Sequence, residues 1–129
     1  MSNTPEKLLE QWVEYVNERE VDNVVKLYDY KSTILPTFTQ DPLSTPKQIK
    51  EYFNQVSSRK NLRVELHAET LKKYKIDENK YILIGTYSFH FIVDNASLTF
   101  PSRFTFVLDM SRERPILHHH SSQIPRMLS

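Results

Sequence analysis

Residues 81–110 read YILIGTYSFHFIVDNASLTFPSRFTFVLDM, and this stretch decides the fold. Both of its arms are rich in β-branched and aromatic residues, which favour strands. The dipeptide Asp94-Asn95 between the arms is typical of a two-residue hairpin turn. The sequence therefore predicts two long antiparallel strands, in which Thr86 lies opposite Arg103 and facing residues share one side of the sheet.

The two sides of this predicted hairpin differ in chemistry. One side is polar and carries Thr86, Ser88, His90, Arg103 and Thr105. The other side carries six aromatic rings, those of Tyr87, Phe89, Phe91, Phe100, Phe104 and Phe106. So many rings left in water would form an interaction surface. We therefore expect the aromatic side to be an exterior that a second copy covers, and the polar side to line a pocket beneath the helices.

Helical periodicity comes before the hairpin in the chain. Thr4-Pro5-Glu6 and the capping box Thr45-Pro46-Lys47-Gln48 each predict a helix start. Between them, Val21, Val24, Val25 and Tyr28 have the spacing of a second, shorter helix, and Ile34-Leu35 predicts a short edge strand. Alternating residues from position 62 and the segment 116–124 complete a four-stranded meander. The prediction is an α+β fold, three N-terminal helices on one curved, mainly antiparallel sheet, in a single domain over residues 1–129.

Composition excludes several classes of function. The chain has 129 residues, no cysteine, one glycine and a formal charge of +1. A disulfide scaffold and a glycine-rich phosphate loop are therefore excluded. The near-neutral charge argues against nucleic acid as a partner, and no apolar run approaches the length of a membrane span. We expect a cytoplasmic protein that binds neither nucleic acid nor membrane and needs no cofactor.

Arg103 is the strongest candidate for a binding residue on the polar side. A guanidinium in mid-strand is costly to bury unless an anion meets it. That anion is either a ligand or a carboxylate from the helices, such as Asp29 or Glu51, and both readings stay open. The polar side offers no carboxylate base, so an enzyme would have to use His90 or His119.

Two clusters of titratable residues are weaker candidates. In His118-His119-His120, neighbouring side chains on a strand point to opposite sides, so the three cannot bind one ion, and we predict no metal site. Glu65, His67 and Glu69 alternate with apolar residues, which indicates a solvent-exposed strand face.

The element order resembles the cone-shaped fold of nuclear transport factor 2-like, cystatin-like proteins, from about Leu8 to Pro125. Four segments look like those of the calcium/calmodulin-dependent protein kinase II association domain and its bacterial SnoaL-like relatives: LPT at 35–37, GTYSF at 85–89, SRFTF at 102–106 and HHHSSQIP at 118–125. The resemblance implies self-association and a deep pocket that takes small carboxylates. It matches Arg103 to a pocket arginine, with Ser88 and Ser121 at two other arginine positions, and it turns His90 and His119 toward the pocket.

These observations lead to one expected function and two rivals. The expected function is a non-catalytic homo-oligomerising domain, a dimer or a higher ring, whose pocket holds a small molecule such as an organic acid. The first rival is a SnoaL-like or ketosteroid-isomerase-like isomerase, cyclase or dehydratase acting on a hydrophobic carbonyl compound, with His90 or His119 as base. The second rival is an adaptor that binds another protein through the aromatic side. Whether the protein catalyses a reaction stays open, although the resemblance favours a non-catalytic protein.

Overall fold

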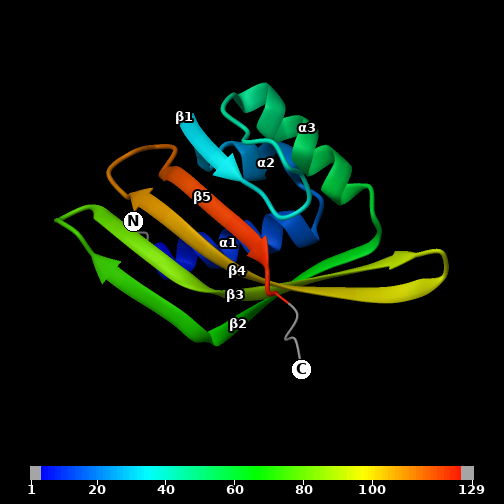
Figure 1. The fold of residues 1–129 in the computed structure, drawn as a ribbon. Coiled ribbons are helices and arrows are strands. Elements are labelled where there is room, and N and C mark those ends of the chain that lie inside the picture. Colours follow the sequence, from blue (N-terminus) through cyan, green and yellow to red (C-terminus); the bar gives the residue numbers. More distant parts are fainter. Residues whose placement is uncertain (1–3, 126–129) are drawn as a thin grey trace.

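A computed structural model describes residues 4–125 and shows helices packed on one side of a curved sheet (Figure 1). The elements are, in order, α1 (Pro5–Asn17), α2 (Val21–Val25), β1 (Tyr28–Leu35), α3 (Pro46–Ser57), β2 (Lys60–Lys75), β3 (Lys80–Val93), β4 (Ala96–Asp109) and β5 (Ile116–Gln123). The sheet order is β1-β5-β4-β3-β2, and β1 runs parallel to β5 while the other neighbours are antiparallel. The predicted α+β architecture is confirmed.

Both predicted starts of the longer helices are confirmed. The Thr4 hydroxyl accepts a hydrogen bond from the backbone N–H of Lys7, and the Thr45 hydroxyl accepts one from that of Gln48, each at 3.2 Å. A proline follows each cap at the first helical position, where its missing N–H costs little. The buried stripes of these two helices consist of Leu8, Leu9, Trp12 and Val16 on α1, and Ile49, Tyr52, Phe53 and Val56 on α3.

The prediction that the second helix reaches Tyr28 is wrong. Helix α2 ends at Val25, and Tyr28 begins β1, where it pairs with Ile116 of β5. The strand is also longer than the predicted element at Ile34-Leu35. Parallel pairing with β5 gives the backbone N–H and C=O groups of β1 hydrogen-bond partners, whereas a helix of only about two turns would leave most of these groups unpaired. The pairing also buries the Tyr28 ring. Tertiary pairing thus overrides the local helical spacing.

The predicted hairpin register is confirmed along its whole length. Thr86 pairs with Arg103, and Val93 pairs with Ala96 across the two-residue turn. Asp94 and Asn95 both have positive φ, 49° and 65°, as a type I′ turn requires. Because the register is right, the division of side chains between the two sides is also right. The orientation of these sides relative to the helices, however, is the reverse of the prediction.

The aromatic side of the sheet faces the helices and forms the core of a single chain. Tyr87, Phe89, Phe91, Phe104 and Phe106 are buried, and Phe100 is partly buried at the base of the hairpin. The Trp12 indole of α1 stacks on Tyr87 at 5.6 Å between ring centroids and meets Phe106 edge-on at 5.8 Å. The apolar stripes of α1 and α3 need an apolar layer to cover, and these rings supply it. The prediction of an exterior aromatic interface is therefore wrong.

Arg103 lies on the opposite side of the sheet, exposed to solvent. Within residues 4–125 no carboxylate lies within 4 Å of its guanidinium, and Asp29, one expected partner, instead pairs with Arg112 at 3.0 Å. Exposure is the inexpensive solution for an unpaired guanidinium, because water replaces the missing anion. The expectation of a charged hollow around Arg103 beneath the helices is wrong.

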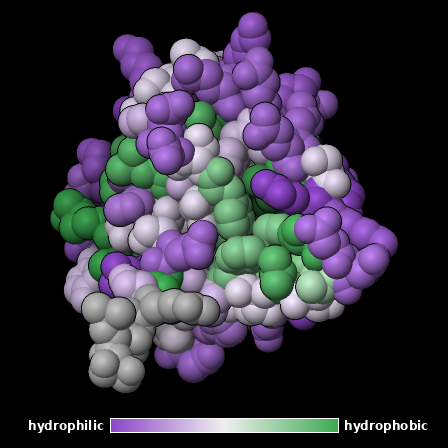
Figure 2. All heavy atoms as spheres, turned by 45° about the vertical axis from the view of Figure 1, so that its right-hand side comes forward, coloured by the Kyte–Doolittle hydropathy of each residue, from purple (hydrophilic) through white to green (hydrophobic). Residues whose placement is uncertain are grey.

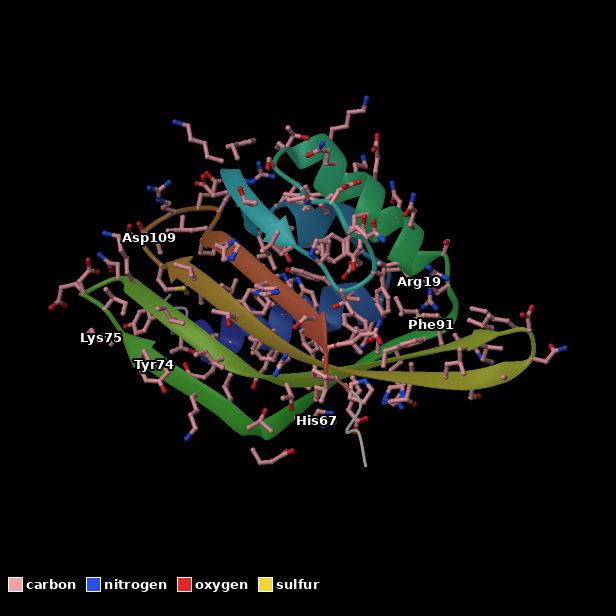
Figure 3. All side chains as sticks on the ribbon, in the orientation of Figure 1. Arg19, His67, Tyr74, Lys75, Phe91 and Asp109 are labelled. Carbon is pink, nitrogen blue, oxygen red and sulfur yellow. The ribbon has the colours of Figure 1, made fainter. Side chains whose placement is uncertain are left out.

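We call this second side of the sheet, which points away from the helices, the outer face. Figure 3 shows His67 and Tyr74 of β2 on it, on the underside of the sheet, whereas Phe91 lies on the helix side at the base of the hairpin. In the described part of the chain no helix covers the outer face (Figure 1). No helix of these residues is long and apolar enough to cross a bilayer.

Candidate functional site

A chain of six hydrogen-bonded side chains lies between the helices and the sheet. The Trp12 indole N–H donates to Tyr28 Oη at 2.9 Å, and Tyr28 Oη lies 2.8 Å from His119 Nδ1. On the other side of the imidazole, Nε2 lies 3.0 Å from Tyr87 Oη. The Tyr87 hydroxyl donates to Ser121 Oγ at 2.7 Å, and Ser121 is hydrogen-bonded to Thr37. We call these residues the buried hydrogen-bond chain.

The direction of this chain follows from the Tyr87 hydroxyl, which donates its proton to Ser121 Oγ. Tyr87 therefore accepts from His119, so the neutral imidazole carries its proton on Nε2. Nδ1 of His119 then accepts from the Tyr28 hydroxyl, whose oxygen also accepts from the Trp12 indole N–H. Because Ser121 accepts from Tyr87, its own proton is free to go to Thr37.

The electrostatics of the site keep it uncharged. Burial, with smaller contributions from the neighbouring His118 and His120, lowers the pKa of His119 to about 3. Burial also raises the pKa of the Tyr28 and Tyr87 hydroxyls well above their usual value. At neutral pH the chain therefore consists of neutral groups.

A small cavity lies beside the buried hydrogen-bond chain. The space open to the centre of a water molecule is about 10 Å³, enough for one water. Among the described residues, none that lines it carries a formal charge at neutral pH. Its walls are formed by Trp12, Ile34, Pro36, Thr37, Tyr52, Phe53, Val56, Tyr87, Phe89, His119 and Ser121. Aromatic side chains thus nearly fill the space between helices and sheet.

The structure divides the predicted site residues between the two sides. His119 and Ser121 are buried and line the cavity. Thr86, Ser88, His90 and Arg103 belong to the outer face, because they alternate along their strands with the buried rings. The expected meeting of His90 and His119 in one pocket does not occur, since the sheet separates them.

On the outer face the polar residues bond to their neighbours in the sheet. His90 Nε2 lies 3.1 Å from Glu65 Oε1, and its Nδ1 lies 2.9 Å from Thr99 Oγ1. Ser88 Oγ lies 2.9 Å from His67 Nε2. The hydrogen bond from His90 lowers the pKa of the Glu65 carboxyl. Within residues 4–125 no three acidic or histidine side chains converge as metal ligands would.

Sequence reasoning missed most of the buried hydrogen-bond chain. The sequence patterns give Trp12 no role, place Tyr28 in the wrong element and Tyr87 in an interface, and include Thr37 only through a resembling segment. A usable signal existed, because buried tryptophan and tyrosine need hydrogen-bond partners for their polar ends. Tyr28 and Tyr87 fall in otherwise apolar patterns, so partners for their hydroxyls could have been sought among the histidines.

Comparison with solved structures identifies the class of fold. A protein from Xanthomonas campestris, provisionally described as a calcium/calmodulin dependent protein kinase II association domain, superposes with a TM-score of 0.82 and 22% identity, over 93% of this chain and 85% of that one. The epoxide hydrolase/cyclase-like enzyme SalBIII, with a role in pyran ring formation in salinomycin, superposes with a TM-score of 0.75 and 16% identity. The match covers 92% of this chain and 89% of that one. A nuclear transport factor 2-like protein with a cystatin-like fold from Novosphingobium aromaticivorans superposes with a TM-score of 0.75 and 5% identity. The match covers 94% of this chain and 80% of that one. This is the nuclear transport factor 2-like fold.

The sequence places the chain more narrowly within that class. Residues 5–125 match the family described as calcium/calmodulin dependent protein kinase II association domain. The chain belongs to this family. No curated protein of known function matches it in sequence.

Proposed function

We propose that this chain is a self-associating domain and that two copies meet through the outer face of the sheet. Family membership supports association. The uncovered outer face supports its location, because half-exposed apolar side chains lie there beside polar ones. Tyr74 is 51% exposed and Ile84 is 40% exposed, on the neighbouring strands β2 and β3. Tyr74 pairs directly with Ile82, so the three side chains form one patch.

The outer face suits this role better than the aromatic side. Opening the aromatic side to a partner would require the helices to leave their own core, whereas the outer face is available in the folded chain. A stable dimer buries roughly 800 Å² on each partner, which a face spanning several strands can provide. In a symmetric dimer the patch meets its own copy, and burial of apolar area drives the association.

Sedimentation velocity at micromolar concentration tests this proposal. We expect the wild-type chain to sediment as a dimer or larger ring and Ile84→Lys to sediment as a monomer, because the new charge would be buried against its own copy. Tyr30→Lys is the matched control, since Tyr30 is 68% exposed on β1, at the far edge of the sheet. A monomeric wild type, or an Ile84→Lys variant that still associates, would contradict the proposal.

For the small-molecule function, the proposed pocket is the cavity beside His119. Its uncharged walls give no support for an organic acid there, because a buried carboxylate would lack a counter-charge. Arg103 could meet an acid only on the outer face. Binding in the cavity would also require the aromatic walls to move, since one water fills the space.

An isomerase, cyclase or dehydratase is the second candidate function. One observation favours it, the neutral His119 held between two phenol hydroxyls. The imidazole could move a proton at a neutral carbonyl compound, and Arg103 would take no part. Deuterium exchange into the methyl group of acetophenone in D₂O tests it. Exchange above the buffer rate that His119→Gln abolishes would support this candidate, and exchange at the buffer rate would exclude it for this compound class.

A further inference from the structure

The segment between β1 and α3 contains a loop with a fixed neck. Ile34 and Leu43 pair as an isolated bridge, with backbone hydrogen bonds of 2.8 and 2.9 Å in both directions. Leu35 still pairs with His120 of β5, and residues 36–42 then leave the body of the protein and return to the same place, as in an Ω-loop. Because the neck is held, residues 36–41 can move without disturbing β1 or α3.

This loop forms part of the wall between the cavity and the solvent. Pro36 and Thr37 line the cavity, and the same two residues line an open cleft of about 250 Å³ on the other side of the loop. Ser121 of β5 also lines both spaces. If the loop lifts, the cavity and the cleft become one pocket.

Two side-chain contacts hold the loop down, and the Tyr52 hydroxyl of α3 also faces the backbone N–H groups of Thr37 and Phe38. The Phe38 ring packs edge-on against three rings at the base of the β3–β4 hairpin, with centroid distances of 5.2 Å to Phe89, 5.7 Å to Phe91 and 5.4 Å to Phe100. The second contact is the Thr37 hydroxyl, hydrogen-bonded to Ser121. Phe38 is only partly buried, and Figure 2, turned to bring the hairpin side forward, shows hydrophobic atoms gathered there among hydrophilic ones. The loop is thus fastened by contacts close to the surface.

Lifting the loop would leave one unsatisfied group in the cavity. Ser121 accepts from Tyr87, so its own proton is not used in that bond and is available to Thr37. When Thr37 withdraws, Ser121 therefore presents a free donor. A ligand must then supply an acceptor, since an unpaired buried polar group is costly. This acceptor must be neutral, because the walls of the cavity hold no charge that could pair with a charged ligand.

We propose that the loop of residues 36–42 is a lid, and that the cavity beneath it binds a flat, uncharged aromatic molecule whose carbonyl oxygen accepts a hydrogen bond from Ser121. Trp12, Tyr87 and Phe53 provide ring surfaces for the aromatic part of such a molecule. The inference rests on the cavity being the small-molecule pocket of the proposed function, and it does not depend on association through the outer face.

The chain provides its own reporter for this test. Trp12 is the one tryptophan of the sequence, it lines the cavity, and its indole N–H begins the buried hydrogen-bond chain. A ¹⁵N-labelled sample therefore gives a single indole N–H resonance. Acetophenone and benzoate are suitable probes, because they have nearly the same shape but differ in charge.

We expect acetophenone to shift the indole resonance, with affinity about tenfold higher for Phe38→Ala than for the wild type, because the lid opens more easily. Benzoate should leave the resonance unchanged. Adding Ser121→Ala to Phe38→Ala should lower the acetophenone affinity about fivefold, since the donor is lost. Tyr30→Ala is the matched control, because it removes an exposed ring that lines neither the cavity nor the cleft, and it should bind like the wild type.

Several results would overturn the inference: no affinity gain in Phe38→Ala, an equal gain in Tyr30→Ala, or benzoate binding as well as acetophenone. If circular dichroism shows that Phe38→Ala is unfolded, Thr37→Val takes its place, because it removes the second contact with little change in shape and should also raise the affinity. Sedimentation of the same variants keeps the outcomes separate. Loss of association would count against the outer-face proposal alone, and failure to bind would count against the lid and its pocket alone.

Discussion

The Tyr28 hydroxyl lies 2.8 Å from Nδ1 of His119, although the two residues are 91 positions apart in the chain. This contact joins the first residue of β1 to the middle of β5, under the cover of α1. The imidazole on which it ends is neutral and carries its proton on Nε2, because Tyr87 donates to Ser121 and so accepts from His119. Nδ1 of His119 therefore accepts from Tyr28, whose oxygen also accepts from Trp12.

Acid should destabilise the fold through His119. Its pKa in the folded state is about 3, against 6.5 in the unfolded chain, so the unfolded state takes up the proton first. The stability from the neutral imidazole is complete above about pH 6.5 and is lost as the pH falls toward 3. At pH 5 the loss should be about 2 kcal/mol. Urea unfolding at pH 7.5, 6, 5.5 and 5 measures it.

Two variants isolate the contribution of His119 to this pH dependence. His119→Gln retains an acceptor and a donor but does not titrate, so its free energy of unfolding should change less between pH 7.5 and 5. His90→Gln, on the outer face, should keep the wild-type dependence. The buried Asp109 is no competitor in this window, because the Ser111 hydroxyl lowers its pKa below 3.8. A His119→Gln profile as steep as the wild type would refute the assignment.

Removing the Tyr28 hydroxyl should destabilise the chain at neutral pH. Tyr28→Phe leaves the Trp12 N–H and His119 Nδ1 buried without partners, at a cost of about 1–3 kcal/mol. Tyr15→Phe is the control, since Tyr15 is only partly buried at the edge of the core. Chemical denaturation measures the free energy of unfolding of both variants. If Tyr28→Phe lowers it as little as Tyr15→Phe does, the buried hydrogen bonds contribute little to stability.

Gly85→Ala should destabilise the sheet although Gly85 has ordinary backbone angles. A Cβ at this position would lie 2.8 Å from Cζ of Phe104 and 3.3 Å from Oγ1 of Thr70. The Phe104 ring is buried against Tyr87, so it has little room to withdraw. Overpacking of this kind costs about 1–3 kcal/mol. Adding Phe104→Leu, which lacks the clashing atom, should make the double variant more stable than the sum of the single effects.

Arg103 and Phe104 give a direct test of which side of the sheet is buried. Arg103→Ala should change the free energy of unfolding by less than about 0.5 kcal/mol, because the side chain is exposed and no carboxylate of residues 4–125 pairs with it. Phe104→Ala should cost about 3–5 kcal/mol, because it empties part of the core. Thermal and urea unfolding of the two adjacent variants would show the contrast. Comparable losses would mean that Arg103 has a structural partner.

Local patterns were sufficient for much of the fold. The caps at Thr4 and Thr45, the turn at Asp94-Asn95 and the register of Thr86 with Arg103 are set by neighbouring residues and by the period of two along a strand, so they could be predicted. Tyr28 could not be assigned correctly, because its strand exists through pairing with β5. Two members of the candidate site, His119 and Ser121, were identified, yet their partners Trp12, Tyr28 and Thr37 come from distant segments.

The sequence by itself determined the two longer helices, the hairpin and the separation of rings from polar groups on alternate sides, because these depend on residue type and spacing. Only the tertiary structure decided which side the helices cover, and with it the burial of the rings and the exposure of Arg103. The physical reason is that strand alternation is symmetric: it sorts side chains into two sets without saying which set meets a second layer. The apolar stripes of α1 and α3 settle that choice, since they can be buried only against the rings.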